Sequence, residues 1–161
     1  MEVSLKDRTT DDAERIWNIL NNDNFRWFGK PPLTIEGERE FIEKELKDPL
    51  KKNYTIMLGD EIVGGIGIKF DAHRNWLAET GYFVEEKHWG KGIATKALTL
   101  LIEKAKEEGI KRFELVTDLN NIGSQKAAIK AGFQRESIQK MKIKDPREGG
   151  FCDCYLFVIL L

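Results

Sequence analysis

The spacing of apolar residues divides the chain into short predicted strands and helices. Apolar and polar residues alternate where strands are expected, as at Val3 and Leu5. They recur every three or four positions where helices are expected, as at Phe41, Ile42 and Leu46. The predicted elements are a strand (residues 1–9), helices (11–22 and 35–48), strands (53–58, 61–70 and 76–84), a helix (93–108), a strand (110–118), a helix (121–131) and strands (133–143 and 151–161). This β-α-α-β-β-β-α-β-α-β-β order predicts one α+β domain over residues 1–161.

Length and charge exclude several classes of protein. A chain of 161 residues can bury a core without disulfides or metals. Its net charge of -1 gives no overall attraction to nucleic acid or anionic lipid. No apolar secretory segment opens the chain, and the longest apolar run, at 155–161, is shorter than the roughly 20 residues that cross a bilayer. We therefore expect a cytoplasmic protein that binds neither nucleic acid nor membranes.

The two cysteines, Cys152 and Cys154, lie two residues apart in a predicted strand. Residues with this spacing share a face at roughly 6.6 Å, which is poor disulfide geometry. Two ligands do not make a zinc site. We expect reduced thiols and no metal, with a redox or metal role as the alternative.

Gly90 and Gly92 stand just before the helix predicted at 93–108. Glycine weakens helices, so the pair suggests a need for close backbone approach at the helix start. The first N–H groups of a helix lack intrahelical partners, and the helix dipole makes that end positive. The pattern predicts an anion site for a phosphate or pyrophosphate, to which Lys87, Lys91 and Lys96 can add charge.

Other interpretations of the glycine pair are an ordinary turn and two known phosphate motifs. The segment lacks the second glycine and the Lys-Ser/Thr pair of a Walker loop. Thr95 replaces the third glycine of a dinucleotide fingerprint, although Glu114 falls near the ribose-binding distance. The strands that precede the loop also differ from the βαβ units of that fold.

The six residues from Lys87 to Gly92, KHWGKG, resemble the [QR]-x-x-G-x-[GA] acetyl-CoA loop of the GNAT superfamily of N-acetyltransferases. The segments AETGYFV, WGKGIATKAL and NIGSQKAAIKAGF resemble its ribosomal-protein and polyamine (RimJ/RimL-like) branch. Lys87 departs from the usual Gln or Arg. The resemblance covers essentially the whole chain and implies three α/β/α layers with a mixed, mostly antiparallel sheet.

The resemblance implies acetyl-CoA as co-substrate and no metal. The backbone of Phe83 and Val84 would bind the pantetheine arm, as one strand pairs with another. Asn121 would reach the pantetheine or phosphate region, and Ser124 would lie near the thiol; helix capping is the alternative for both. The pyrophosphate would lie on the amides of His88, Trp89, Gly90, Lys91, Gly92, Ile93, Ala94 and Thr95.

The implied reaction is direct attack of a neutral amine on the thioester in a ternary complex. Ala128 stands where many relatives have a tyrosine acid, so Ser124 is the expected substitute. Glu79, in an otherwise apolar strand, is the expected base and amine-binding residue, although it could instead be a surface or salt-bridged glutamate. Asp118 is the second choice, and His73 a less favoured proton shuttle.

The acceptor side is expected at the aromatic loop 25–28, with Trp27 as the first contact, unless these aromatics only clamp the loop onto the core. Glu36, Glu38 and Glu40 could attract a cation or simply suit a helix dipole. We expect an acetyl-CoA-dependent N-acetyltransferase acting on a protein N-terminus, a polyamine or an aminoglycoside-like amine. The alternatives are a non-catalytic acyl-CoA-binding sensor and, less favoured on charge, a nucleotide- or nucleic-acid-binding module. A homodimer is left open.

Overall fold

The computed structural model describes residues 2–25, 27, 29–145 and 147–161, and its element order is the predicted one. The strands are β1 (Val3–Asp7), β2 (Lys51–Leu58), β3 (Glu61–Phe70), β4 (Leu77–Val84), β5 (Arg112–Asp118), β6 (Gln134–Lys144) and β7 (Phe151–Leu160). The helices are α1 (Ala13–Leu20), α2 (Ile35–Leu46), α3 (Ile93–Glu107) and α4 (Ile122–Lys130). Short 3₁₀ helices η1 (Thr10–Asp12) and η2 (Glu86–His88) precede α1 and the glycine loop.

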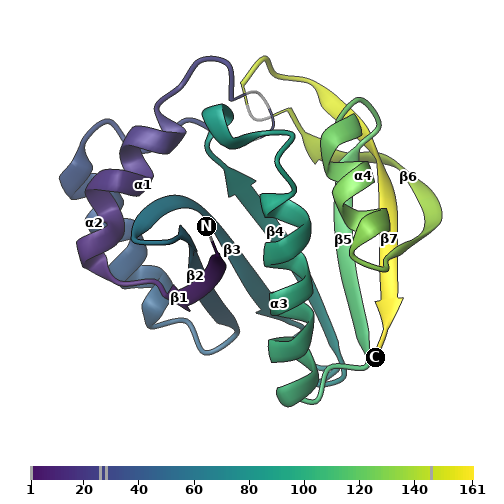
Figure 1. Ribbon diagram of the computed structural model, residues 1–161. Helices are drawn as coiled ribbons and strands as arrows, with labels where there is room; N and C mark the ends of the chain where they lie inside the picture. The colour runs from purple at the N-terminus through teal and green to yellow at the C-terminus, as the bar shows by residue number, and fades with distance from the viewer. Residues whose placement is uncertain (1, 26, 28, 146) are drawn as a thin grey trace.

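The strands form one sheet in the order β1-β2-β3-β4-β5-β7-β6. Among the strands of the described residues only β4 and β5 are parallel, so the expected mixed, mostly antiparallel sheet is confirmed. Figure 1 shows α3 crossing the front of the sheet and α4 beside β5 and β7, while α1 and α2 lie together on the other side of the molecule. The expected three-layer α+β fold is therefore confirmed.

Two apolar clusters hold the layers together. The larger one joins α3 and α4 to the sheet, and Leu98, Leu101 and Phe113 in it are fully buried. The smaller one joins α1 and α2 to the sheet through Phe83 of β4. No helix in the described part of the chain is long and apolar enough to cross a membrane.

The expected inward face of α2 is only partly correct. Ile42 is buried at 2% exposure, but Phe41 and Leu46 are 48% and 55% exposed. Glu38 lies on the buried face instead, beside Arg8 of the segment after β1. Burial raises the pKa of Glu38 and the positive charge of Arg8 opposes that rise. The pattern of charged and apolar residues in this helix does not reveal which face a distant arginine occupies.

The parallel pairing of β4 with β5 ends early. It runs from Leu77 opposite Arg112 to Thr80 opposite Leu115, and both strands then continue without pairing to each other. Beyond Thr80, β4 keeps β3 on one side, and none of the described residues forms a strand on its other side. The sheet thus splits at its centre, next to the glycine loop and the start of α3.

Candidate active site

The start of α3 has free backbone donors. Gly92 is its N-cap in the left-handed conformation, with φ 78°, and no side chain caps the helix. The first helical hydrogen bond runs from Lys96 N–H to Gly92 O at 3.1 Å. The N–H groups of Ile93, Ala94 and Thr95 therefore have no partner within the helix. Gly90, with φ 75°, shapes the turn that leads to this site.

A cavity of about 540 Å³ opens beside this helix start, between β4 and α4. It is lined by every residue expected to bind the cofactor except Lys91, which is exposed outside it. The lining also includes Lys126 and Lys130, one turn apart on α4, and Tyr82 of β4, none of which the sequence analysis named. A helix N-terminus with two nearby cations is suited to hold phosphate groups.

The strand geometry changes the expected role of Phe83. Glu85 N–H donates to Val63 O at 2.8 Å, so the alternation of an antiparallel ladder turns the N–H and C=O of Phe83 toward β3. The same alternation turns those of Tyr82 and Val84 toward the split. Phe83 therefore contributes its ring to the cavity wall. The open backbone edge consists of the N–H and C=O of Tyr82 and the N–H of Val84, because Val84 O accepts the indole N–H of Trp89.

Aromatic side chains connect the loop before α2 with the glycine loop. The indole of Trp89 donates to Val84 O at 2.6 Å, and its ring lies 5.7 Å from that of Phe25. Phe25 is buried and meets Phe83 edge to face at 6.3 Å. Trp27 lines the cavity, while residues 26 and 28 of the predicted aromatic wall lie outside the described residues.

A second cavity of about 100 Å³ lies where β4 and β5 separate. It shares Trp27, Tyr82, Asn121 and Ser124 with the first cavity, so the two spaces meet at these residues. Its own lining comes from the end of β5, the β6–β7 hairpin and β4, and consists of Gly81, Leu115, Val116, Thr117, Asp118, Ile143 and Cys152.

Asp118 gives this second cavity a carboxylate. Its Oδ1 accepts the Asn120 N–H at 2.8 Å, which fixes the side chain at the end of β5. A hydrogen bond to Asp118, together with burial, raises the pKa of the Cys152 thiol. Within the described residues no cation forms a salt bridge with Asp118, so its charge remains available to a ligand.

Several other candidate residues lie elsewhere. Glu79 is exposed and 3.9 Å from Lys69 Nζ, and it lines neither cavity. His73 is exposed in the loop before β4. Glu114 pairs with Arg112 at 2.8 Å rather than reaching a ribose site. Glu36, Glu38 and Glu40 also lie away from both cavity linings.

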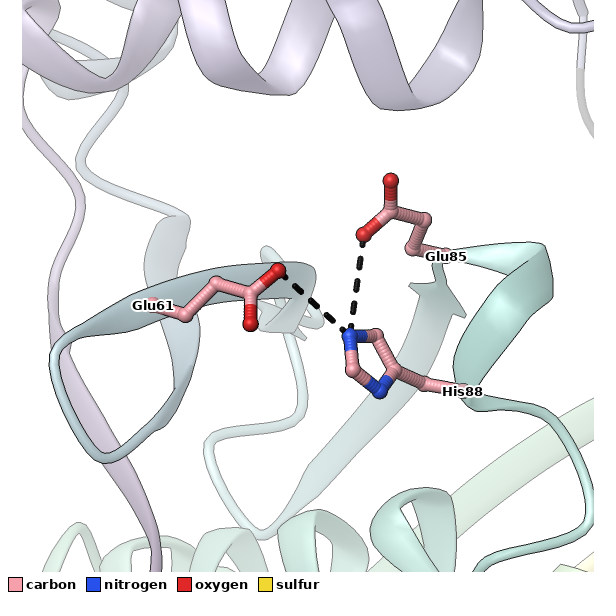
Figure 2. A group of neighbouring side chains, drawn as sticks. All are labelled: Glu61, Glu85 and His88. Atoms are coloured by element: carbon pink, nitrogen blue, oxygen red, sulfur yellow. Dashed lines mark ion pairs between the residues drawn. The ribbon is translucent and has the colours of Figure 1, made fainter.

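His88 lines the first cavity but also faces two carboxylates. Figure 2 shows its Nε2 pointing toward Glu61, at 3.5 Å, and Glu85, at 3.8 Å. Their ligand atoms lie within 4.8 Å of one another, a spacing that could hold a metal ion. However, Arg15 is 2.5 Å from Glu85 and Lys87 is 2.9 Å from Glu61, so an ion would have to displace two cations. Lys87 therefore belongs to this ion-pair cluster and not to the phosphate site expected for it.

Comparison with known proteins decides the family. The family described as acetyltransferase (GNAT) domain matches residues 3–134, which include the glycine loop and the sheet split. The chain belongs to the GNAT acetyltransferase family. The resemblance noted from the sequence is thereby confirmed.

Relatives of this GNAT chain are named as acetyltransferases. It is 33% identical over 120 residues to a probable N-acetyltransferase, YjcK, of Bacillus subtilis, a match that covers 69% of this chain and 65% of that protein. It is 33% identical over 90 residues to the ribosomal-protein-serine acetyltransferase of Escherichia coli, covering 55% and 50%. The chain thus spans between half and two thirds of the length of these relatives.

A solved structure shares the fold over almost the whole chain. The microcin C7 self-immunity acetyltransferase MccE, in complex with acetyl-CoA and AMP, superposes with a TM-score of 0.89 at 25% identity. The match covers 99% of this chain and 93% of that one. The MccE complex shows that a closely similar GNAT fold binds acetyl-CoA.

The residues of this GNAT chain fit the parts of acetyl-CoA. Uncapped amides and two lysines suit the phosphates, and the unpaired edge of β4 suits the peptide-like pantetheine arm. The four-residue spacing of Lys126 and Lys130 was a readable signal, because it places both on one helix face. The positions of Tyr82 and Cys152 in the cavity linings depend on the separation of β4 from β5, which no local sequence pattern predicts.

Proposed function

We propose that this chain is an acetyl-CoA-dependent amine N-acetyltransferase. The observation that carries the proposal is that the two cavities adjoin and share four lining residues. One begins at an uncapped helix start, and the other contains the Asp118 carboxylate, which forms no salt bridge among the described residues; Tyr82 and Ser124 line both cavities. An acyl donor held in the first cavity would present its thioester to an amine held in the second.

The chain's own groups account for donor binding. The amides of Ile93 to Thr95 and the side chains of Lys126 and Lys130 would hold the phosphates. The backbone N–H and C=O of Tyr82 and the N–H of Val84 would pair with the pantetheine arm. Asn121, which caps α4 by accepting the Ser124 N–H at 3.2 Å, would stand beside it. Acetyl-CoA supplies the activated acetyl group.

Asp118 is the proposed carboxylate for the acceptor, in place of Glu79. An alkylammonium has a pKa near 10 and must lose a proton before its nitrogen can attack. A carboxylate in the second cavity can bind that ammonium and, directly or through water, take its proton. Trp27 and Ile143 would contact the carbon chain of the amine. Positioning the two reactants in one cleft supplies much of the rate enhancement.

The proposal is tested by binding and by turnover. Acetyl-CoA at 100 times its Kd should stabilise the fold by about 2.7 kcal/mol. Free coenzyme A should then be released with at least one amine from a panel of peptide N-termini, polyamines and aminoglycosides. Binding without turnover across the panel would indicate an acyl-CoA sensor instead. No thermal shift at saturating acetyl-CoA would overturn the proposal altogether.

A pair of variants tests the acceptor carboxylate. Asp118→Asn keeps an oxygen for the Asn120 N–H but removes the charge, so kcat/KM for the amine should fall by about 100-fold or more. Glu79→Gln removes a carboxylate outside both cavities and should leave turnover unchanged. The reverse result would restore Glu79 as the base and exclude Asp118. Acetyl-CoA thermal shifts of both variants should equal that of the native chain.

A further inference from the structure

The phenol of Tyr82 lies where the two cavities meet. Tyr82 is two residues beyond the last β4–β5 pair, and its hydroxyl donates to Ser124 Oγ at 3.1 Å. Ser124 stands in the first turn of α4, so this hydrogen bond connects β4 with α4, the two elements on either side of the first cavity. Both residues line both cavities. A side chain here is positioned between donor and acceptor.

The Ser124 hydroxyl is not needed to cap its helix. Asn121 already caps α4 through its side chain, which accepts the Ser124 N–H. Within the described residues, Tyr82 is the hydrogen-bond partner of Ser124 Oγ, and it occupies one acceptor position of that oxygen. A serine hydroxyl has one proton and two lone pairs, so Ser124 keeps its proton to donate elsewhere.

The phenol of Tyr82 is suited to remain a hydrogen-bond donor. Burial raises the pKa of Tyr82, which keeps the phenol protonated through the neutral range. A hydroxyl that accepts a hydrogen bond also becomes a better donor, because chains of hydrogen bonds polarise one another. On α4, the position where the family resemblance leads us to expect a tyrosine acid is the fully buried Ala128. The phenol at this site therefore comes from a strand.

We propose that Tyr82 is a positioning residue, which turns the Ser124 O–H toward the sulfur of the thioester. This inference rests on the proposed acetyltransferase function. During transfer the amine nitrogen forms a bond to the carbonyl carbon, the C–S bond breaks, and its electron pair goes to sulfur. Asp118 takes the first proton of the ammonium and passes it to water before the attack. Ser124 donates a hydrogen bond to the developing thiolate, and the second proton, which the nitrogen loses as the amide forms, passes to the Asp118 carboxylate. Coenzyme A leaves as a thiolate and is protonated by water.

A double-mutant cycle tests this role. Ser124→Ala should lower kcat by about 100-fold, as does removal of a donor aimed at developing charge. Tyr82→Phe should lower kcat by about tenfold, with the KM for acetyl-CoA unchanged. The double variant should be no slower than Ser124→Ala, because the phenol acts only through the serine. Ser124→Thr, which keeps a hydroxyl, should restore sensitivity to Tyr82→Phe.

Tyr155→Phe is the matched control. Tyr155 packs edge to face against Phe157 on β7, lines neither cavity, and should tolerate the change without loss of kcat. Multiplying losses in the double variant, or a Tyr82→Phe variant with native kcat, would overturn the inference. If the native chain transfers an acetyl group to no amine, the proposed function is refuted. The native chain is assayed alongside the variants, so this outcome is distinguished from failure of the inference about Tyr82.

Discussion

Gly92 and Gly109 stand at opposite ends of α3, in the same backbone conformation. Their φ angles are 78° and 81°, and an added Cβ would meet nothing within 4 Å at either position. Replacing either glycine with alanine should therefore lower the free energy of unfolding by a similar amount, about 1–2 kcal/mol for a residue in the left-handed conformation. Only Gly92 is at the proposed phosphate site, so Gly92→Ala should raise the KM for acetyl-CoA by about tenfold, or about 1.4 kcal/mol.

Gly109→Ala is the control for that prediction, because it changes stability without approaching the donor. Steady-state kinetics at saturating amine and chemical denaturation of both variants give the two readouts. Equal KM values in the two variants would mean that the phosphates bind elsewhere. Equal stability losses with unequal KM values would support the proposed placement.

Single residues could be predicted where their role depends on neighbours in sequence. The glycine pair at 90 and 92 is an example, because backbone conformation and helix start are local properties. Lys87 is a counterexample. Its Nζ lies 2.9 Å from Glu61, a residue of another strand, and that ion pair removes it from the phosphate site. Partners this distant in sequence are set by the fold alone.

At the scale of one element, β4 pairs with β3 along one edge and leaves its other edge unpaired beyond Thr80. Gly81 lies in its unpaired part and lines the second cavity, and an added Cβ would meet nothing within 4 Å. Gly81→Val should therefore fold, since valine suits a strand, and its methyl groups should fill the acceptor space. The KM for the amine should rise by about tenfold or more.

The acetyl-CoA thermal shift of Gly81→Val should stay native, because the first cavity is not filled. Gly64 of β3 provides the contrast: a Cβ there would lie 2.1 Å from Phe83 O, so Gly64→Ala should lower the melting temperature. An amine KM that Gly81→Val leaves unchanged would remove the second cavity as the acceptor site.

The elements themselves could be predicted because their periodicity is local. Boundaries agree to within a few residues, and Thr34 caps α2 by accepting the Gly37 N–H at 3.0 Å. The cap before α1 is harder to identify from sequence. Asp11 and Glu14 have the spacing of a capping box, but the structure places the reciprocal contacts between Thr9 and Asp12. The residue at which β4 stops pairing with β5 depends on both strands together, so the hydrophobic pattern of either strand alone does not predict it.

At the scale of the whole molecule, Asp12 connects a helical layer to the sheet. It is 2% exposed at the end of η1, and its carboxylate contacts β1 and β2, the first two strands of the sheet. Lys6 Nζ of β1 lies 2.6 Å from Oδ1, and Thr55 Oγ1 of β2 donates to Oδ2 at 2.8 Å. The α1–α2 layer, whose loop supplies Trp27 to the site, is held on the sheet partly through this one carboxylate.

The pKa of Asp12 gives this connection a pH dependence. Burial alone would raise its pKa, but the hydrogen bonds from Lys6, the Thr9 N–H and Thr55 outweigh burial and lower it. A carboxyl whose pKa is lower in the folded state stabilises the fold above its unfolded pKa, about 3.9. That contribution is lost as the pH falls through the lower folded value.

Asp12→Asn should therefore remove stability at neutral pH and much less in acid. The amide cannot carry the charge and directs donors toward groups that are themselves donors, so the loss at pH 7 should be about 1.5–3 kcal/mol. Asp11→Asn, at an exposed position in the same turn, should change stability by less than about 0.5 kcal/mol. Urea unfolding at pH 7 and near pH 2 measures both. A deficit of the Asp12 variant that is the same at the two pH values would show that its charge does not join the layers.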